Sequence, residues 1–445
     1  MNEWKKVKIG EICQIIKGTT GIASAEPGEY PLVVTALERK TCSSFQFDCE
    51  AVCIPLVSSS GHGKKSLNNV HYQSGKFALG TILCAVIPNN SNELDVRFLH
   101  QYLQFYKDKI LVPLMKGAAN VSLSMKDIAK VEIPLPSIEK QHELSELFVE
   151  AQKKYKELLV ESEKQKVYVK QLRQNILREA IEGKLTEEWR KTATIEESGK
   201  QFLDHIIEER NAKLFTEWEE AKKKNPKAKK PTQIVASEID EEKALFEIPE
   251  SWCWCRIDDI FAHNSGKALN KSESKEGTEL EYITTSNLYW NYFELDNLKT
   301  MLFKDSEIEK CTVKKGDFLV CEGGEVGRSA IWTFDRTICI QNHIHRLRAY
   351  ESKLNILFYY YVMYLFKVSK VIDNYAKGIG IKGLSSNALG SIIVPLPPLA
   401  EQKEIVSRVE KLLANVTELE KQITEREEMT KQLMQSIMKD AFREE

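Results

Sequence analysis

The 445-residue chain lacks several features that would assign it to a large class of proteins at once. It has no uninterrupted apolar run of about 18 residues, so we expect no membrane-spanning helix. Its first residues, Met1 to Lys6, lack the apolar core of a signal peptide, so the cytoplasm is the expected compartment. No Cys-x-x-Cys pair occurs among its ten cysteines, and its eight histidines give no zinc spacing. We therefore interpret the cysteines as reduced core residues, with a disulfide or metal framework as the weaker alternative.

Catalytic motifs are missing as well. An adenine methyltransferase would carry a [DNS]-P-P-[YFW] tetrapeptide, but the nearest string, Asp373-Asn374-Tyr375, lacks both prolines. There is no F-x-G-x-G signature for a methyl donor, no P-loop for ATP and no G-x-S-x-G nucleophile elbow. The glycine-rich segment Glu322–Arg328 contains two glutamates that would repel a phosphate, which argues against a nucleotide site. An enzyme whose site is built from scattered residues is the alternative that stays open.

The net charge of −2 gives no general indication of a nucleic-acid partner. Residues 1–137 carry a net charge of +3 and residues 251–398 a net charge of +1, so the rest of the chain carries −6. The acidic residues are thus concentrated outside the two segments that we expect to be globular. This distribution is compatible with DNA contact by those segments.

An internal repeat is the main positive feature of the sequence. Residues 116–181 align with residues 377–442 at a constant offset of 261 without a gap, and 17 of the 66 positions are identical. The identities include Lys-Gly at 116–117 and 377–378, Pro-Leu-Pro at 134–136 and 395–397, and glutamine at 141 and 402. A second repeat, at offset 248, opens each half: it aligns Trp4, Val7, Ile9, Ile12 and Gly18 with Trp252, Cys255, Ile257, Ile260 and Gly266. Each half is thus one copy of the same architecture, and its variable block is 13 residues longer in the second half.

Two long helices are predicted at the ends of the halves, and they share one heptad register. Apolar positions recur at alternating steps of four and three residues, which predicts a coiled-coil seam. In the first helix this seam comprises Leu144, Phe148, Ala151, Tyr155, Leu158, Ser162, Gln165, Val169, Leu172 and Ile176. In the second helix it comprises Ile405, Val409, Leu412, Val416, Leu419, Ile423, Arg426, Thr430, Leu433 and Ile437. Gln165 and Arg426 form a polar layer midway along the seam.

Each of these helices has about 40 residues and therefore rises by roughly 60 Å. Pro136, Pro397 and Pro398 lie just before them, where proline can begin a helix but not continue one. A seam of this length needs an apolar partner, so we expect the two helices to pair antiparallel within the chain. The alternative is that each helix packs on its own globular block or on another chain.

Between the halves lies a polar connector that includes a predicted amphipathic helix over Phe202–Glu220. The lysine-rich run Lys222–Pro231 follows this helix. A charge run of this kind is usually a solvated linker, and a phosphate-binding role is the less favoured alternative.

The blocks at residues 5–135 and 252–395 have the pattern of mixed α/β modules. Short β-branched or aromatic runs alternate with turns, and a helical segment follows in each block, at Val96–Lys109 and Leu354–Val371. The loop Ser58–Ser66 offers hydroxyls, an imidazole and two ammonium groups, which suit phosphate and base-edge contact. The segment Gln341–Arg348 is predicted as a strand with Gln341, His343 and His345 on one face. Glutamine and asparagine can contact adenine, and arginine can contact guanine.

These loops and the repeated Lys-Gly pairs supply the candidate DNA contacts. Whether Lys-Gly is a shared turn or a shared phosphate-binding site is left open by the sequence. In the first half the candidates are Lys17, Thr19, Ser59, Ser60, His62, Lys64, Lys65, Lys116 and Asn120. In the second half they are Lys267, Thr285, Asn287, Arg328, Gln341, Asn342, His343, Lys377 and Lys382. We assign no catalytic residue and no metal ligand.

With these features together, the chain resembles the specificity subunit of Type I restriction–modification enzymes. The resemblance covers essentially the whole chain, and the segments that carry it are the Trp openings, the Pro-Leu-Pro entries, Gln141 and Gln402, the helix end Ile176–Thr186, Gly316–Leu319 and Gln341–Arg348. The first block departs from this pattern, because it has Gly80-Thr81-Ile82-Leu83 where the second has a Lys-x-Gly-Asp strand. This departure suggests that the two halves recognise different targets.

The resemblance implies an α+β fold with a pseudo-two-fold repeat. It comprises target-recognition domains at residues 1–137 and 251–398, coiled-coil helices at 138–187 and 399–445, and a connector at 188–250. It further implies a non-catalytic, sequence-specific DNA-binding subunit whose two domains recognise a bipartite double-stranded DNA target. Two modification (methyltransferase) subunits and restriction/translocase subunits would be its partners, and S-adenosylmethionine, ATP and Mg²⁺ would belong to those partners. A coiled-coil scaffold that joins two protein-binding domains is the alternative from another class.

Overall fold

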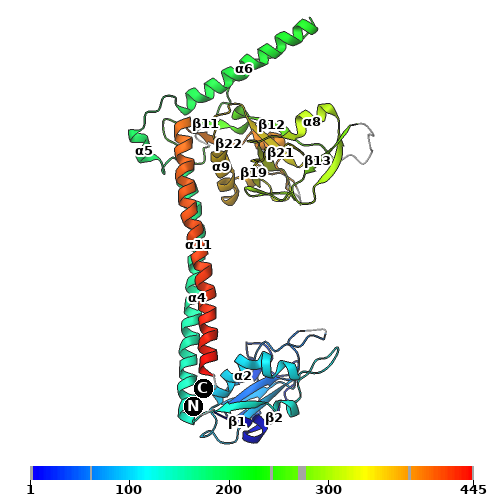
Figure 1. Cartoon of the computed structure of the whole chain (residues 1–445), viewed down its shortest axis with the longest axis vertical. Coiled ribbons are helices and arrows are strands. Elements are labelled where there is room, and N and C mark those ends of the chain that lie inside the picture. Colours follow the sequence, from blue (N-terminus) through cyan, green and yellow to red (C-terminus); the bar gives the residue numbers. More distant parts are fainter. Residues whose placement is uncertain (1–3, 61–62, 241–243, 269–276, 379–381, 443–445) are drawn as a thin grey trace. The chain divides into compact units, whose positions relative to one another are not determined.

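The computed structural model describes residues 4–60, 63–240, 244–268, 277–378 and 382–442 (Figure 1). The chain forms two compact units, Met1–Gln165 with Gln422–Glu445, and Lys166–Lys421. The division between them falls within the two long helices, so each helix contributes to both units. Within the described ranges, no helix combines the length and the apolar character that a membrane crossing requires.

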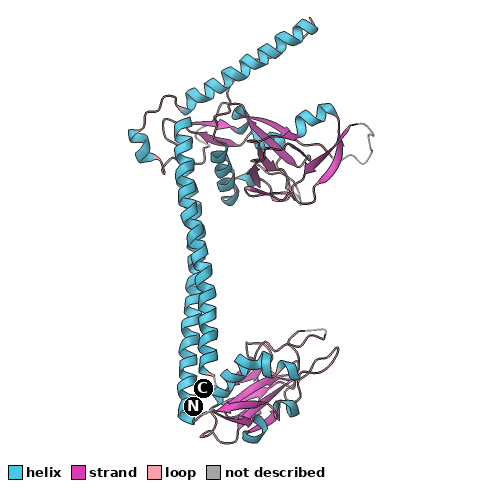
Figure 2. Cartoon of the chain, in the orientation of Figure 1, coloured by secondary structure: helices cyan, strands magenta, loops and turns pink. Residues whose placement is uncertain are grey.

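The first unit contains a module of short strands and two main sheets, which Figure 2 shows in magenta. Its strands are β1 (Lys5–Lys8), β2 (Cys13–Lys17), β3 (Tyr30–Val33), β4 (Lys40–Cys42), β5 (Phe47–Asp48), β6 (Ala51–Pro55), β7 (His71–Gln73), β8 (Lys76–Leu79), β9 (Leu83–Pro88) and β10 (Glu132–Leu135). Its helices are α1 (Ile9–Ile12), α2 (Val96–Ile110), α3 (Met125–Ile128) and the start of α4 (Ile138–Ile181), with a 3₁₀ turn at Val112–Leu114.

The second unit contains the corresponding module and the connector. Its strands are β11 (Cys253–Arg256), β12 (Phe261–Ser265), β13 (Thr278–Ile283), β14 (Leu288–Tyr289), β15 (Tyr292–Phe293), β16 (Lys299–Phe303), β17 (Thr312–Val313), β18 (Phe318–Cys321), β19 (Ser329–Ile331), β20 (Ile338–Ile340), β21 (Ile344–Ala349) and β22 (Ile393–Leu396). Its helices are α5 (Glu187–Thr192), α6 (Gly199–Lys224), α7 (Ile257–Ile260), α8 (Asp305–Cys311), α9 (Ile356–Val368), α10 (Ser386–Gly390) and the start of α11 (Leu399–Ala441), with a 3₁₀ turn at Ile372–Asn374.

The two modules have the same sheet topology, which confirms the predicted repeat. The sheet order β2-β9-β6-β7 in the first unit corresponds to β12-β21-β18-β19 in the second, and β4-β3-β8-β5 corresponds to β16-β13-β20-β17. The two-stranded sheets β1-β10 and β11-β22 even share their register, because Val7 pairs with Ile133 and Cys255 pairs with Val394. These four residues are related by the sequence offsets of 248 and 261. The β14-β15 hairpin is an additional element of the second module.

This topology corrects one predicted correspondence between the halves. Gly80–Leu83 was expected to replace the strand that begins after Gly316-Asp317. Gly316-Asp317 precedes β18, whose counterpart is β6, whereas Gly80–Leu83 leads into β9, whose counterpart is β21. The two glycine-containing segments look alike in sequence, but they precede strands that occupy different positions in the equivalent sheets.

Local sequence explains the central elements of both modules. The run Ala51–Pro55 is buried at every position, as expected for a strand that is covered on both faces. Helix α2 begins after Asp95, whose carboxylate accepts a 2.7 Å hydrogen bond from the Phe98 backbone N–H. Helix α9 is apolar around nearly its whole circumference, and eight of its residues are buried in the core of the second unit.

Helices α4 and α11 pack antiparallel against each other in each unit, as predicted. In the first unit Arg426 donates a hydrogen bond to Gln165, which forms the predicted polar layer. In the second unit Arg173 donates to the Glu420 carboxylate at 3.0 Å. The buried seam residues are Leu144, Phe148, Ser162, Val169, Ile176, Ile405, Val409, Val416 and Ile423, and the half-buried ones include Tyr155, Leu412 and Ile437.

Four predicted seam leucines are exposed in the structure, which corrects the seam at these positions. Leu158 and Leu172 on α4 are 45% and 42% exposed, and their repeat counterparts Leu419 and Leu433 on α11 are 43% and 59% exposed. These leucines occupy one of the two heptad positions of the seam, whereas the other position stays buried or half-buried along α4, at Phe148, Tyr155, Ser162, Val169 and Ile176. The half-buried residues next to Leu158 and Leu172 are Leu159 and Arg173.

A buried glutamine joins each long helix to its module. The Gln141 amide donates to the Pro136 and Glu93 carbonyls at 2.9 Å, and its oxygen accepts from the Asp95 backbone N–H at 2.8 Å. In the second unit the Gln402 amide donates to the Pro397 carbonyl at 2.8 Å and accepts from the Asn355 backbone N–H at 3.0 Å. Both side chains are fully buried. The repeated glutamine therefore connects the first turn of each long helix to the start of α2 or α9.

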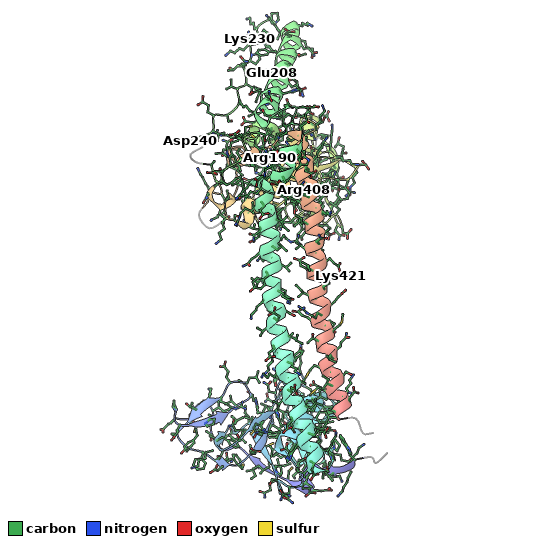
Figure 3. The ribbon with its side chains drawn as sticks, turned by 90° about the vertical axis from the view of Figure 1, so that its left-hand side faces the viewer. Arg190, Glu208, Lys230, Asp240, Arg408 and Lys421 are labelled. Carbon is green, nitrogen blue, oxygen red and sulfur yellow. The ribbon has the colours of Figure 1, made fainter. Side chains whose placement is uncertain are left out.

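A buried carboxylate at the start of α11 organises the second unit further. Glu401, which is 0% exposed, accepts from Thr186 at 2.7 Å, from Arg190 at 2.7 and 3.0 Å, and from the Trp252 indole at 2.8 Å. The repeated Trp opening of the second half is thus a hydrogen-bond donor to the long helix. Figure 3 labels Arg190 together with Arg408, which donates to the Leu185 carbonyl at 2.9 Å.

Candidate nucleic-acid interface

A hairpin that carries the repeated Lys-Gly pair occurs in both units. Lys116 and Ser122 exchange two backbone hydrogen bonds of 2.8 Å, and Lys377 and Gly383 exchange bonds of 3.0 and 2.9 Å. Gly117 and Gly378 have φ angles of +123° and +135°, a backbone region that disfavours residues with a Cβ. A shared turn therefore explains the repeated glycine. Phosphate contact by the Lys116 and Lys377 side chains, both of them exposed, stays a prediction.

Each hairpin is attached to the end of a central strand. After β6, the Ser58 backbone N–H donates to the Val121 carbonyl at 3.0 Å, and the Leu123 N–H donates to the Leu56 carbonyl at 2.9 Å. After β18, the Leu384 N–H donates to the Glu322 carbonyl at 2.8 Å. Because β6 and β18 are topological counterparts, the same two segments meet in both modules.

A groove lies between these segments in the first unit. It has a volume of about 740 Å³ and is lined by Val57, Ser58, Ser60, Ala118, Ala119, Asn120 and Val121. Its polar groups are hydroxyls and an amide, which can donate to and accept from base edges. Lys64 and Lys65 are exposed on the neighbouring loop, where ammonium groups could contact phosphates. The predicted residues Ser60 and Asn120 therefore lie in one groove.

A smaller, charged groove lies at the corresponding place in the second unit. It has a volume of about 320 Å³ and is lined by Thr285, Glu322, Gly323, Gly324, His343, Lys377, Lys382 and Gly383. His343 Nδ1 lies 3.4 Å from a Glu322 carboxylate oxygen. Four predicted residues, Thr285, His343, Lys377 and Lys382, thus share this groove. The different chemistry of the two grooves supports the expectation that the halves recognise different targets.

The serine loop of the first unit is held together by its own hydroxyls. Ser58 Oγ donates to the Lys64 carbonyl at 2.5 Å, and the Ser60 and Ser66 hydroxyls lie 2.7 Å apart. Ser59 Oγ accepts from the Asn68 backbone N–H at 2.9 Å. These bonds join the described residues on the two sides of the loop, 58–60 and 63–68. The predicted contact His62 lies outside the described residues.

Three predicted contacts lie near the starts of the modules, two in the first module and one in the second. Lys17 is the exposed last residue of β2, and Thr19 is bound through its backbone N–H and hydroxyl to the Gln46 amide oxygen at 2.9 and 3.0 Å. Lys267 donates to the Glu307 carboxylate at 2.6 Å and to the Leu302 carbonyl at 2.7 Å. Its hydrogen bond lowers the pKa of Glu307. The Lys267 charge is therefore neutralised within the module.

Two further candidates shape a loop beside the second groove. The Asn287 amide oxygen accepts from the Thr284 backbone N–H at 2.9 Å, and its nitrogen donates to the Glu294 carbonyl at 3.0 Å. Arg328 is 16% exposed, donates to the Thr285 carbonyl and lies over the Tyr289 ring at 5.1 Å. Both side chains hold the loop in place in this structure.

The predicted strand Gln341–Arg348 begins later than expected. β20 ends at Ile340 and β21 begins at Ile344, so Gln341, Asn342 and His343 form a turn between two sheets. The alternation that suggested one face holds only from Ile344 onward. His345 is buried, with its ring nitrogens 3.0 Å from His263 and 2.7 Å from the Leu384 carbonyl. His345 therefore contacts the segment that contains the Lys-Gly pair through the Leu384 carbonyl, and its burial makes it inaccessible to a ligand.

Within the described residues, one group of side chains has the spacing of a metal site. His205 and Glu209 on α6 and Glu351 offer ligand atoms that lie within 4.8 Å of one another. His205 and Glu209 form an exposed pair one helical turn apart, at 3.2 Å. This arrangement is that of an ordinary surface ion pair, and we assign it no metal.

Sequence reasoning missed the residues that build the grooves between the predicted ones. Ala118 and Ala119 in the first unit and Gly383 in the second were not singled out, Ser58 was considered only as part of its loop, and Glu322–Gly324 only as an unsuitable nucleotide site. The repeated Lys-Gly pair was a usable signal, because a repeated turn is expected to contact equivalent strands in the two halves. Identifying that strand end requires the sheet order, which the sequence does not display.

The chain is thus built of two modules that share one topology, and each module has a groove at the same place. With its two antiparallel helices, this architecture defines a two-module binding protein. The chain belongs to the Type I restriction modification DNA specificity domain family, whose model matches residues 1–172 and 249–428.

Individual relatives and a solved structure agree with this membership. The chain is 25% identical over 448 residues to the Type I restriction enzyme EcoDI specificity subunit of Escherichia coli, a match that covers 100% of this chain and 88% of that protein. It is 46% identical over 66 residues to the EcoKI specificity subunit of Escherichia coli (strain K12), which covers 15% and 14% of the two proteins. The HsdS subunit from Thermoanaerobacter tengcongensis has the same fold, with a TM-score of 0.58, 16% identity and coverage of 100% and 97%.

Proposed function

We propose that this chain is the sequence-specific DNA-binding specificity subunit of a Type I restriction–modification complex. Each module binds one half of a bipartite double-stranded DNA target. The chain also serves as the docking platform for methyltransferase and restriction subunits.

The observation that carries the proposal is the groove built twice from equivalent segments. In each module a Lys-Gly hairpin meets the end of a central strand, and exposed lysines lie at or beside the groove. Lysines can contact the backbone phosphates, while hydroxyl, amide and imidazole groups can contact base edges. Two similar binding modules in one chain suit a target with two separated halves.

Exposed apolar side chains on the long helices support the docking role. Leu158, Val160, Val167 and Tyr168 on α4 are 45–62% exposed, and Leu419, Met429 and Leu433 on α11 are 43–62% exposed. Large apolar groups exposed at this density on a helix pair are typical of surfaces that another protein covers. We assign the modification subunits to this surface.

Catalysis is proposed to reside in the partners. The methyl donor, ATP and Mg²⁺ would be bound by the modification and restriction subunits, and this chain would supply recognition and spacing.

Single-molecule methylome sequencing of a host that carries this system tests the proposal. We expect one methylated motif with two specified halves and a fixed gap. The purified chain alone should transfer no methyl group, and activity should appear when modification subunits are added. A continuous motif, or methyl transfer by the chain alone, would reject the assignment.

A further inference from the structure

Helix α6 and the segment that follows it form an arm on the second unit, which we define as residues 199–237. The first half of α6 is packed into the unit, since Phe202, Leu203, Ile206 and Ile207 are buried. Asn211 is the last buried residue of the helix, and the 13 residues beyond it extend α6 by roughly 20 Å. Figure 1 shows this end of α6 projecting from the body of the second unit.

The arm is a built structure, because the returning segment is bound along the helix. The Asn211 side chain exchanges two 2.8 Å hydrogen bonds with the Ile234 backbone. Farther out, the Trp218 indole donates to the Ala228 carbonyl at 3.2 Å, and the Lys230 ammonium lies over the Phe215 ring. At the base, Arg210 donates to the Asp259 carbonyl at 2.9 Å and stacks on Tyr350.

The outer end of the arm carries six lysines and no acidic residue between positions 222 and 230. All six are exposed, and Figure 3 labels Lys230 beside the outer part of α6. Lys222 and Lys230 lie over aromatic rings of the arm. In the part of the chain that the structure describes, no carboxylate lies within 4.0 Å of any of the remaining four, Lys223, Lys224, Lys227 and Lys229. The tip is therefore a cluster of exposed positive charge, preceded on α6 by Glu219 and Glu220.

The composition of the tip favours a nucleic-acid backbone over a protein surface. Protein interfaces have apolar and aromatic centres and are depleted in lysine. Between positions 219 and 234 the described chain has no large apolar side chain that is highly exposed. Lysine ammonium groups are point charges that bind phosphate without identifying bases, whereas bidentate arginine, which is absent from the tip, is the typical base contact.

We propose that this arm binds the DNA phosphate backbone outside the half-site that the second module recognises. The proposal rests on the proposed function, because it assumes that the second module holds DNA. The contact is independent of sequence and adds affinity without changing the recognised motif.

The test compares three forms of the chain in complex with its modification subunits. In one, Lys223, Lys224, Lys227 and Lys229 are changed to Gln; in the matched control the same four are changed to Arg. DNA binding is measured at several salt concentrations with duplexes that contain the bipartite target. Each lost phosphate contact lowers the slope of log affinity against log salt by about 0.9, so the Gln variant should have a slope smaller by roughly 2 to 4. The Arg variant should retain the wild-type slope, and all forms should melt at the same temperature.

Duplex length gives a second measurement. Shortening the DNA beyond the second half-site should weaken wild-type binding but leave the Gln variant unchanged, and shortening it beyond the first half-site should affect both equally. Equal slopes for wild type and the Gln variant would overturn the proposal. Loss of subunit assembly at an unchanged slope would overturn it too, because the partner would then be a protein. Absence of salt-sensitive target binding by the wild-type complex would instead reject the proposed function itself.

Discussion

The ring of Phe442 stacks on the ring of Phe148, with centroids 4.9 Å apart and planes inclined by 27°. Phe442 follows the last turn of α11, and Phe148 is the eleventh residue of α4, so the contact joins two residues that are 294 positions apart. Phe98, Tyr102, Phe105 and Tyr106 of α2 surround the same ring at 5.2–6.2 Å. This aromatic cluster fastens the end of α11 to the core of the first unit.

Removing the Phe442 ring should destabilise the first unit. We expect Phe442→Ala to lower the free energy of unfolding by about 3–5 kcal/mol, the usual cost of deleting a buried aromatic side chain. Leu433→Ala on the same helix is the matched control, because Leu433 is 59% exposed and should cost under about 1 kcal/mol. Urea denaturation followed by circular dichroism measures both. Similar losses in the two variants would contradict the anchoring role.

The Glu401 carboxylate should be essential for the stability of the second unit. Glu401→Gln leaves the largely buried Arg190 guanidinium without a counter-charge, and breaking such a pair costs about 3–5 kcal/mol. Glu404→Gln, which breaks the more exposed pair with Arg408, should cost about 1 kcal/mol or less. The double variant Arg190→Met/Glu401→Leu should be less destabilised than Glu401→Gln alone. A double variant that unfolds more readily than the single one would refute the charge argument.

The stability of the second unit should fall in mild acid because of His263. Burial, and after it the neighbouring His345 imidazole, lower the pKa of His263 to about 4, whereas an unfolded histidine titrates near 6.5. Between these values the unfolded chain binds a proton that the folded chain does not. The stabilisation is therefore complete above about pH 6.5 and is lost as the pH falls, by about 2 kcal/mol at pH 5. Urea midpoints at pH 7 and pH 5 should differ less in His263→Gln than in the wild type. Titration of His263 near 6.5 in the folded protein would disagree with this.

The lysines of the second groove should contribute charge and not sequence preference. In the complex with modification subunits, we expect Lys377→Gln/Lys382→Gln to weaken DNA binding equally for matched and mismatched second half-sites. The salt slope should decrease by about 2. Lys310→Gln/Lys353→Gln, which alters exposed lysines elsewhere in the same unit, is the control. A change in the methylated motif would show that these lysines contact bases.

The exposed leucines on the long helices should act in assembly and not in folding. Leu158 and Leu419 are repeat counterparts, 45% and 43% exposed, so we expect each to lie on one of two equivalent docking surfaces. Leu158→Asp should leave the melting temperature of the free chain unchanged but reduce the bound modification subunits from two to one. The double variant with Leu419→Asp should bind none. Native mass spectrometry counts the subunits, and full assembly of the double variant would exclude this surface.

The sequence predicted the architecture well because the repeat imposes it. Two repeats identified two copies of one module and two long helices before any strand was located: the Trp openings at an offset of 248 and the Pro-Leu-Pro tripeptides at an offset of 261. The register of β1 with β10 and of β11 with β22 follows those offsets residue by residue. Periodicity gave the helix pair but not its exact buried face, because a heptad pattern does not show which of its two positions the partner helix covers: Val169 is buried, whereas Leu158 and Leu172 are exposed.

The candidate site was predicted only in part. Thr285, His343, Lys377 and Lys382 were chosen for their chemistry, and the fold brings them to one groove. Lys267 and Arg328 were chosen by the same criterion but are bound to Glu307 and to the Thr285 carbonyl within the module. Composition cannot distinguish residues that line the groove from residues that are paired within the module, since either outcome depends on which loops of different sheets lie close together. Glu401 gave no signal either, because its burial results from partners 149 to 215 positions away.

Each module begins and ends on one two-stranded sheet, β1 with β10 or β11 with β22. The chain therefore enters and leaves a module at adjacent points, and the whole intervening block behaves as a cassette. Exchange of such a block at these strand pairs would also replace the residues at the start of α2 that contact Gln141 and Phe442, so an incoming block would have to supply its own contacts to the long helices.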